Sequence, residues 1–440
     1  MNKELQLCCI LIDNIFELIL FVIVTIWFNR LALRGYRVLS VEEQLRVITS
    51  GTMQIVPLDG LKEKLKKGTP LNIKLGVDPT SPDLHLGHAV PLRKMRQFQD
   101  LGHNVTLIIG SGTALIGDPS GRDSTRPPLT AEQVDANAET YVNQAMKILD
   151  PERTTVVHNG DWIKPMNLET MLGLMSKFTI ARILEREDFS NRYHNQQPIA
   201  LHEFIYPVLQ AYDSVVIKAD VEMGGNDQIF NLLAGRDLMR DMDMEPQIAL
   251  TMPLLVGTDG TKKMSKSYGN YIGLTDEPND MFGKVMSITD EIIPMYYRLC
   301  STLSIDELDA IDKSFEDGTA DPYQLKRALG RNIVDLYHGE GEGLKAQASF
   351  DAQFKNNEVP DDVKEFAISL EADEDGLIYL PKILVEAGIA SSNGDARRLI
   401  DGGGIKINQK PIAAKTYKVE PSVLEGALLQ AGKKRWAQLI

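Results

Sequence analysis

The stretch from Leu71 to His88, LNIKLGVDPTSPDLHLGH, decides the fold of this chain. Apolar side chains occupy every second position from Leu71 to Val77, which predicts a strand, and the proline-containing turn that follows cannot continue it. His85 and His88 then stand at the predicted start of a helix, where apolar residues return at helical spacing. The first amides and the dipole of a helix that follows such a turn favour negative charge. The stretch therefore predicts an anion-binding site.

A second strand is predicted from Asn104 to Ser111, NVTLIIGS, so strand, helix and strand follow one another within about 40 residues. Such a βαβ unit predicts a parallel sheet with a right-handed crossover. Ligands of parallel sheets bind at the carboxyl ends of the strands, where Asp78, Thr80 and Asp118 stand in this sequence. The predicted fold class is therefore α/β, with a Rossmann-like parallel sheet.

The remaining segments divide by hydrophobic periodicity and by turn residues. Helices are predicted at 41–67 with breaks at Gly51 and Pro57, at 130–149 after a Thr130–Gln133 capping box, at 166–189 in pieces, at 201–213, from 224–228 to 240, and across 279–349. Extended segments are predicted at 154–157, 214–219, 221–223 and 248–256. A polar loop rich in glycine follows the last of them and is predicted to be mobile.

The composition, with 43% hydrophobic and 25% charged residues over 440 positions, is that of a globular protein with two or three domains. The net charge of −14 argues against a protein that coats nucleic acid, but it allows a local basic patch. Cys8, Cys9 and Cys300 form no C-x-x-C pair. We therefore expect a reducing compartment, with neither a disulfide framework nor a zinc site.

An apolar run from Leu18 to Phe28, LILFVIVTIWF, is unusual for such a composition. Polar residues between Asp13 and Glu17 limit it to 11 residues, short of the ~20 that a membrane-spanning helix needs. No basic segment or small-residue cleavage site marks it as a secretory signal. We expect residues 1–38 to be an extension ahead of a soluble protein that begins near Leu39; a membrane anchor is the alternative.

The balance of charge changes sharply towards the C-terminus. Residues 350–376 hold nine acidic and two basic side chains, whereas residues 377–440 hold ten basic and five acidic ones. An acidic, hydrophilic segment ahead of a compact basic module predicts a linker and a separate domain. The expected organisation is an extension at 1–38, a Rossmann-like domain at 39–256, a helical domain at 257–349, a linker at 350–376 and a small α+β domain at 377–440.

A second motif, Lys263-Met264-Ser265-Lys266-Ser267, stands in the polar loop after the last predicted strand. Lysines in such a run usually form a solvated face, and histidines at a helix start can be simple caps. However, lysines and hydroxyls on a flexible loop also suit a polyphosphate whose charge rises during a reaction. The two motifs in this order on an α/β pattern favour the functional interpretation.

The paired H-x-G-H and K-M-S-K-S motifs resemble those of the class I aminoacyl-tRNA synthetases. The segments GVDPTSPDLHLGH, GDPSG, LQAYD and GGNDQ, with their spacings, resemble the bacterial-type tyrosyl-tRNA synthetases from about Val41 to the C-terminus. This resemblance implies activation of L-tyrosine with ATP, followed by transfer of tyrosine to the 3′ end of tRNA(Tyr). It also implies Mg²⁺ that accompanies ATP, no permanent metal site, a cytoplasmic location and a homodimer formed through an insertion between Thr130 and Val216.

The resemblance also assigns roles on the ATP side. Catalytic groups at the phosphates would be His85, His88, Lys263, Lys266 and Thr80, and the other ATP-binding residues would be Asp78, Gly87, Gly225, Asp227 and Ser267. Because the carboxylate of tyrosine is itself the nucleophile, no side chain has to become one. Catalysis can then rest on positioning and on charge stabilisation around the α-phosphate and the departing pyrophosphate.

On the amino-acid side, the residues that the resemblance implicates are Lys74, Asp118, Tyr206, Gln210, Asp213 and Gln228. Asp118, Tyr206 and Gln210 would bind the ammonium, and Gln228 would lie near the carboxylate. Tyr206, Gln210 and Asp213 have the spacing of one helix face, which is consistent with a single pocket. Asp213 would accept the phenol hydroxyl. Lys74 departs from the family, since many members have a tyrosine there; its ammonium could donate to the phenol oxygen or pair with Asp213.

The segment LPKILVEAGIASSNGDARRLIDGGGIKINQK resembles the RNA-binding fold named for ribosomal protein S-four. Its candidate RNA-binding residues are Lys382, Arg397, Arg398 and Lys406. The two arginines are expected on a helix, and Gly402 to Gly404 would turn the chain into a strand that carries Lys406. Such a surface can hold phosphates and 2′-hydroxyls without reading bases deeply.

Other functions share part of this pattern. The tryptophanyl-tRNA synthetases have the fold and both motif types, but they lack the C-terminal module and the set Tyr206, Gln210 and Asp213. A small H-x-G-H nucleotidyltransferase needs neither the second motif nor the basic module. A non-enzymatic RNA-binding or splicing protein built on a retired synthetase would not need the histidines and lysines that this chain retains.

Overall fold

The computed structural model describes residues 39–79, 83–117, 130–353, 363–367, 372–432 and 435–440. The chain divides into two compact units. The first comprises residues up to Thr80, Pro91–Glu139 and Leu149–Pro253, and the second comprises Ser81–Val90, Thr140–Ile148 and Leu254–Ile440. The expected extension at 1–38 lies outside the described residues. Within the described ranges, no helix has the length and apolar character needed to cross a membrane.

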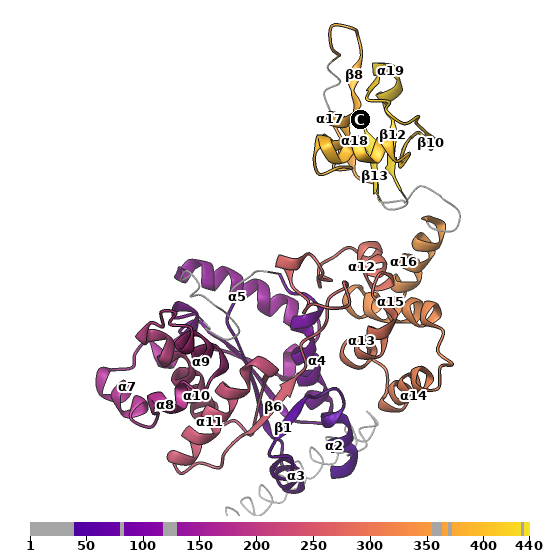
Figure 1. The fold of residues 1–440 in the computed structure, drawn as a ribbon. Coiled ribbons are helices and arrows are strands. Elements are labelled where there is room, and N and C mark those ends of the chain that lie inside the picture. The colour runs from indigo at the N-terminus through magenta and orange to yellow at the C-terminus, as the bar shows by residue number, and fades with distance from the viewer. Residues whose placement is uncertain (1–38, 80–82, 118–129, 354–362, 368–371, 433–434) are drawn as a thin grey trace, which may run out of the picture. The chain divides into compact units, whose positions relative to one another are not determined.

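A six-stranded sheet with the order β1-β6-β5-β2-β3-β4 forms the centre of the first unit (Figure 1). Its strands are β1 (Gln54–Val56), β2 (Asn72–Val77), β3 (Asn104–Ile109), β4 (Thr154–His158), β5 (Val221–Gly225) and β6 (Ile248–Met252). Neighbouring strands pair in parallel, except that the edge strand β1 is antiparallel to β6. The predicted Rossmann-like α/β fold is therefore confirmed.

Strand β2 lies inside this sheet, where its central residues Ile73, Lys74 and Leu75 are at most 4% exposed. From β2 the chain continues to β3 and β4 on one side, and it later returns to add β5 and β6 on the other side. The strand order thus reverses between β2 and β5. Open parallel sheets bind their ligands outside the carboxyl ends of the strands at such a reversal.

Helices α10 (Ile205–Ile217) and α11 (Ile229–Asp241) pack against each other; α10 also contacts β2, and α11 contacts β5 and β6. Thr130 and Gln133 exchange hydrogen bonds of 3.0 and 3.3 Å as the predicted capping box at the start of α5. The other helices of residues 39–253 are α2 (Val41–Thr49), α3 (Leu58–Lys66), α4 (Leu86–Asp100), η1 (Thr113–Leu115), α5 (Ala131–Ala145), η2 (Pro151–Arg153), α6 (Gly160–Ile163), α7 (Leu168–Met175), α8 (Ile180–Ile183), α9 (Glu187–His194), η3 (Leu201–Phe204) and η4 (Asn226–Gln228).

The prediction of an extended segment at 214–219 was wrong. Helix α10 continues to Ile217 and ends only at Lys218, which has a left-handed φ of 51°. The β-branched run Val215-Val216-Ile217 favours a strand locally, but packing of α10 against α11 overrides that preference. The predicted helix at 41–67 also contains the short strand β1, and the strand predicted at 248–256 ends at Met252, before Pro253.

The second unit contains the predicted run of helices, and it is confirmed as α12 (Pro278–Met286), η6 (Asp290–Ile292), α13 (Ile293–Cys300), α14 (Ile305–Glu316), α15 (Pro322–His338) and α16 (Glu342–Asp351). Helices α12 and α15 approach closely because Gly330 faces Phe282, whose ring would lie 2.8 Å from a Cβ at that position. Phe282 and Tyr296 are fully buried in this packing.

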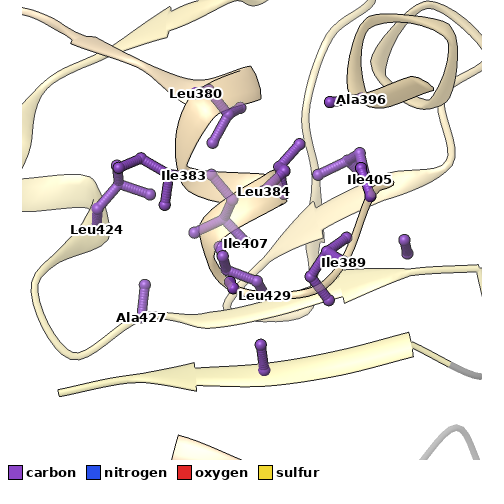
Figure 2. Close-up of a cluster of buried hydrophobic side chains, with 14 of the residues drawn as sticks. Leu380, Ile383, Leu384, Ile389, Ala396, Ile405, Ile407, Leu424, Ala427 and Leu429 are labelled. Atoms are coloured by element: carbon purple, nitrogen blue, oxygen red, sulfur yellow. The ribbon is translucent and has the colours of Figure 1, made fainter. Parts of the chain in front are cut away.

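The C-terminal residues form the small α+β fold that the sequence predicted. A five-stranded sheet, β10-β9-β12-β13-β7, and a two-stranded one, β11-β8, surround helices α17 and α18. Figure 2 shows Leu384 of α17 among side chains that include Ile407 and Leu429 from the sheet. The bounds are β7 (Glu365–Phe366), β8 (Ile378–Tyr379), α17 (Leu380–Glu386), α18 (Asn393–Asp401), β9 (Ile405–Ile407), β10 (Lys410–Pro411), β11 (Lys418–Val419), α19 (Pro421–Leu424), β12 (Leu428–Ala431) and β13 (Arg435–Leu439).

Candidate active site

In the second unit, His85 and His88 stack at the start of α4, with ring centroids 3.9 Å apart. The backbone N–H of His85 donates to Nδ1 of His88 at 3.3 Å, and the backbone N–H of Gly87 donates to Nδ1 of His85 at 3.2 Å. Each Nδ1 is therefore an acceptor without a proton. A neutral imidazole in that state carries its proton on Nε2, so both rings can donate from Nε2 to an anion.

Burial keeps these rings uncharged at neutral pH. Burial, together with smaller contributions from the neighbouring His88 and Lys266, lowers the pKa of His85 to about 3. Burial also lowers the pKa of His88 to about 4, again with a contribution from Lys266. The pair is thus a set of neutral hydrogen-bond donors next to a lysine. Such donors stabilise developing negative charge without a competing proton transfer.

Gly87 allows this arrangement. A Cβ at Gly87 would lie 3.0 Å from Cε1 and Nδ1 of the His85 ring and 3.7 Å from Cβ of Met264. A side chain would therefore force the His85 ring to move. The same distances place Met264, the centre of the second motif, directly against the start of α4 within this unit.

The loop of the second motif is held in place by its own hydrogen bonds. The N–H of Met264 donates to the carbonyl of Leu255 at 2.8 Å, and the Met264 side chain is buried. Asn270 accepts from the N–H of Ser265 at 2.8 Å and donates to the carbonyl of Lys263 at 3.2 Å. The predicted loop therefore has a defined path, and Ser265 caps the short helix η5 (Lys266–Tyr268).

Lys266 pairs with Asp83 at 3.0 Å, and both side chains are partly exposed, at 31% and 57%. An exposed ion pair is worth only about 0–1 kcal/mol, so a phosphate can replace the Asp83 carboxylate at little cost. Lys263 and Ser267 are exposed on the same loop. The second unit thus brings together His85, His88 and Lys266, three of the residues that the sequence assigned to the phosphates.

In the first unit, Asp78 ends a polar network at the carboxyl end of β2. Its Oδ2 accepts from the Tyr206 hydroxyl at 3.0 Å, and its Oδ1 accepts from Oγ1 of Thr113 at 2.8 Å. The Asn159 amide, at the end of β4, donates to Thr113 at 3.1 Å and to Asp213 at 3.2 Å. Asp78, Tyr206 and Asp213 therefore belong to one hydrogen-bonded cluster, as the helical spacing of the last two predicted.

Asp213 lies at the buried end of this cluster and is 3% exposed. One carboxylate oxygen accepts from the Trp162 indole N–H at 2.9 Å, and the other accepts from Asn159. Burial raises the pKa of Asp213 to about 6, while Lys74 and the hydrogen bonds from Trp162 and Asn159 act in the opposite direction. At neutral pH Asp213 is therefore mostly ionised and acts as an acceptor.

Lys74 has a different partner from the one considered in the sequence. Its ammonium pairs with Glu222 at 3.2 Å, not with Asp213, and it donates to the Ser214 hydroxyl at 2.6 Å and to the Gln210 carbonyl at 3.2 Å. A fully buried ammonium needs a counter-charge, and the carboxylate opposite it on β5 is closer than the one on α10. The sequence did not indicate Glu222, because it does not show that β5 pairs with β2 and places Glu222 opposite Lys74.

Glu222 also orients Gln210, whose Nε2 donates to Oε1 of Glu222 at 3.0 Å. At the carboxyl end of β5, Gly225 leads into η4, where Asp227 is exposed and Gln228 accepts from Asn231 at 2.9 Å. Sequence reasoning also missed Thr113, Asn159 and Trp162. A polar residue just after a predicted strand was the available signal for Thr113 and Asn159. Thr80 and Asp118 lie outside the described residues.

The C-terminal candidate residues lie on α17, α18 and β9; the predicted helix for Arg397 and Arg398 and the predicted strand for Lys406 are confirmed. Arg397 donates to the Tyr379 hydroxyl at 2.7 Å, and its guanidinium lies 5.6 and 5.8 Å from the ring centroids of Tyr379 and Tyr417. Arg398 has a side chain that is 77% exposed, and Lys382 pairs with Glu386 at 3.8 Å. Lys406 is half-buried on β9. Exposed cations beside aromatic rings suit a phosphate backbone.

Comparison with known proteins gives concordant matches. Residues 66–355 match the family of class I tRNA synthetases (W and Y), and residues 380–423 match the S4 domain. The tyrosine–tRNA ligase of Syntrophotalea carbinolica is 47% identical over 406 residues, which cover 91% of this chain and 98% of the relative. That of Aquifex aeolicus is 47% identical over 400 residues, which cover 91% and 99%.

Solved structures give the same fold. The tyrosyl-tRNA synthetase of Archaeoglobus fulgidus, solved with L-tyrosine, has a TM-score of 0.58 at 21% identity, covering 70% of this chain and 100% of that one. A C-terminally truncated mitochondrial tyrosyl-tRNA synthetase of Aspergillus nidulans has a TM-score of 0.59 at 23% identity, covering 74% and 98%. Likeness at this identity supports the architecture alone.

The protonation state assigned to the stacked rings predicts a titration result. Between about pH 8 and about pH 5.5, the ring resonances of His85 and His88 in ¹³C-histidine NMR spectra should not shift, because both pKa values lie well below 6.5. His85→Gln and His88→Gln variants assign the signals. Titration of either ring with a midpoint near its ordinary value would contradict the neutral donor pair.

The same pKa values fix the sign of a stability effect. Because the unfolded chain binds these protons more readily than the folded chain, the pair should lower the free energy of unfolding as the pH falls from about 6.5 towards about 4.

Proposed function

The chain belongs to the tyrosine–tRNA ligase family of class I tRNA synthetases, and we propose that it joins L-tyrosine to tRNA(Tyr) in two steps with the residue roles that follow. In the first step a carboxylate oxygen of tyrosine attacks the α-phosphorus of ATP. The bond from that phosphorus to the β-phosphate oxygen breaks, and pyrophosphate leaves. In the second step a terminal ribose hydroxyl of the tRNA attacks the tyrosyl carbonyl, and AMP leaves.

The observation that carries the tyrosine assignment is the buried carboxylate of Asp213, which already accepts from Trp162 and Asn159. A phenol hydroxyl that donates to this carboxylate adds a charge-assisted hydrogen bond. Phenylalanine would leave the carboxylate buried without that donor, at a cost of about 1–3 kcal/mol. The curated relatives are named tyrosine–tRNA ligases, and this supports tyrosine over tryptophan.

The ammonium of tyrosine would bind where Tyr206 and Gln210 lie on one face of α10, with Asp118 as a further partner. Asp78 orients the Tyr206 hydroxyl by accepting its hydrogen bond at 3.0 Å. Asp78 was assigned to ATP in the sequence, and its bond to Tyr206 supports a role on the amino-acid side as well. Gln228 would then lie near the substrate carboxylate at the end of β5.

The phosphates would be held by the second unit. His85 and His88 donate from Nε2 to the α-phosphate as its negative charge increases, while Lys263, Lys266 and Ser267 hold the departing pyrophosphate. Gly87 lets the nucleotide approach the start of α4, Thr80 would add a hydroxyl, and Gly225 and Asp227 would hold the ribose. None of these residues forms a covalent bond to the substrate, so catalysis rests on positioning and on charge stabilisation.

Mg²⁺ would enter with ATP, bound to its phosphates. Among the described residues, no group of three or more His, Cys, Asp or Glu side chains is arranged to hold a metal ion. The C-terminal surface with Lys382, Arg397, Arg398 and Lys406 would bind the tRNA backbone. Residues 130–216 would form the contact of a homodimer, which we propose from the family resemblance, as we do a cytoplasmic site of action.

Amino-acid-dependent exchange between ATP and labelled pyrophosphate tests the proposal directly. Tyrosine alone among the amino acids should stimulate exchange strongly, because only its phenol donates to the buried Asp213. Asp213→Ala should reduce the preference for tyrosine over phenylalanine by roughly 5- to 150-fold, which corresponds to about 1–3 kcal/mol, and should leave the KM for ATP nearly unchanged.

Asp59→Ala serves as the matched control, because that aspartate is exposed on α3 and contacts no residue of the proposed site. Exchange stimulated by tryptophan, or by no amino acid, would refute the tyrosine assignment. An unchanged preference in Asp213→Ala would remove Asp213 from the role proposed for it.

The proposed tRNA surface predicts a separation of the two steps. Arg398→Ala should leave tyrosine-dependent exchange unchanged but raise the KM for tRNA, because a phosphate contact is lost. The slope of log KM against log salt should fall by about one unit. Equal aminoacylation by variant and parent at every salt concentration would exclude Arg398 from tRNA binding.

A further inference from the structure

Lys74 and Glu222 lie directly opposite each other on β2 and β5. These are the neighbouring parallel strands between which the strand order reverses. Their side chains are each 1% exposed and pair at 3.2 Å. The ion pair therefore joins the two strands that flank this reversal, and ligands of such folds bind outside the carboxyl ends of these strands.

Stability alone gives little reason for this pair. Moving both charges out of water costs about as much as their attraction returns, and apolar side chains of similar volume are often as stable or more stable. We therefore expect the pair to act through the groups to which it donates and from which it accepts hydrogen bonds. Those groups lie on one turn of α10, around Asp213.

The ammonium of Lys74 holds the backbone and a side chain of that turn. It donates to the carbonyl of Gln210 at 3.2 Å and to the hydroxyl of Ser214 at 2.6 Å. Ser214 directly follows Asp213, and Gln210 lies three residues before it. The ammonium of Lys74 thus donates two hydrogen bonds to the turn of α10 that carries Asp213. These bonds fix the position of that turn along the helix axis and its rotation about the axis.

The carboxylate of Glu222 holds the side chain of Gln210. It accepts from Gln210 Nε2 at 3.0 Å and from the Ser214 hydroxyl at 3.1 Å, and the Gln247 amide also donates to it. Because an ionised carboxylate only accepts, Gln210 must turn its NH₂ group towards Glu222. The Oε1 atom is then the remaining acceptor of that amide, which is the group that an ammonium requires.

We propose that Lys74 and Glu222 are a positioning pair for tyrosine recognition, which fixes Gln210 as an acceptor for the substrate ammonium and Asp213 as the acceptor for its phenol. This inference rests on the function proposed above. Lys74 acts through α10 and does not itself donate to the phenol oxygen. Both ends of the substrate are then set by one interaction at the centre of the sheet.

The pair also acts on the charge of Asp213. The groups around that carboxylate are Lys74 from β2, Glu222 from β5, and the uncharged donors Trp162 and Asn159 that follow β4. Burial raises the pKa of Asp213 to about 6, Lys74 lowers it, and Glu222 raises it. Removing one member of the pair should therefore shift this pKa in the direction opposite to removing the other.

The test is the pH dependence of kcat/KM for tyrosine in ATP–pyrophosphate exchange. The parent should lose activity on the acid side near pH 6, as Asp213 becomes protonated. Lys74→Met should move this midpoint up by about one pH unit, and Glu222→Gln should move it down by about one unit. The double variant should return close to the parent midpoint, with a raised KM for tyrosine and an unchanged KM for ATP.

Glu203→Gln provides the matched control. Glu203 pairs with Arg192 in the same unit, with side chains 1% and 4% exposed, but neither residue contacts the cluster around Asp213. This variant should lower the thermal unfolding midpoint without moving the acid midpoint or the KM for tyrosine. A purely structural role for Lys74 and Glu222 predicts an unchanged KM for tyrosine in their double variant, whatever the acid midpoints of the single variants.

Midpoints that move in the same direction, or that do not move, would overturn the proposal. Circular dichroism establishes that each variant is folded. Glu222→Gln is nearly isosteric and decides the question by itself if Lys74→Met does not fold. If the parent shows no tyrosine-dependent exchange, the proposed function fails; if it does and the midpoints stay fixed, the positioning pair fails alone.

Discussion

A positive charge in the middle of a parallel sheet has to find its counter-charge inside the protein, and the arrangement of the polar groups around Asp213 follows from this constraint. The counter-charge of Lys74 is the carboxylate of Glu222 on the neighbouring strand. The hydrogen bonds left on both groups go to α10. The sheet thereby determines where the polar face of α10 lies, although that helix follows β2 by more than a hundred residues in the sequence.

Burial favours the uncharged form of titratable groups in both units, but the two proposed sites need different charge states. At the proposed phosphate site, burial keeps His85 and His88 neutral, so that both rings can donate hydrogen bonds beside the charge of Lys266. Around the proposed phenol site, burial disfavours the ionised form of Asp213, and Lys74 together with donors from Trp162 and Asn159 offsets this effect. Because folding raises the pKa of Asp213 from 3.8 to about 6, the free energy of unfolding falls as the pH rises between these two values, and the full cost is present above about pH 6. The ionised form of Asp213 therefore lowers the free energy of unfolding of the chain.

The sequence predicted the parts of the fold that local pattern controls. The alternating residues of β2, the capping box at Thr130 and the helix start at His85 were all read correctly. The strand predicted at 214–219 was wrong because β-branched residues favour a strand locally, whereas packing against α11 keeps that segment helical. The two motifs indicated the histidines and lysines of the proposed phosphate site, and helical spacing grouped Tyr206 with Asp213. The partner of Lys74 could not be predicted, since Glu222 stands 148 positions away and the register of β2 with β5 exists only in the folded chain.

The central claim is that an ionised Asp213 accepts the phenol of tyrosine, and proton release on binding measures this most directly. Titration calorimetry of tyrosine binding at pH 6, in buffers of different ionisation enthalpy, should show release of about half a proton per site, because about half of Asp213 is protonated before binding. At about pH 8 the release should vanish, and Asp213→Asn should abolish it at pH 6. Binding at pH 6 without proton release, or with proton uptake, would contradict the account.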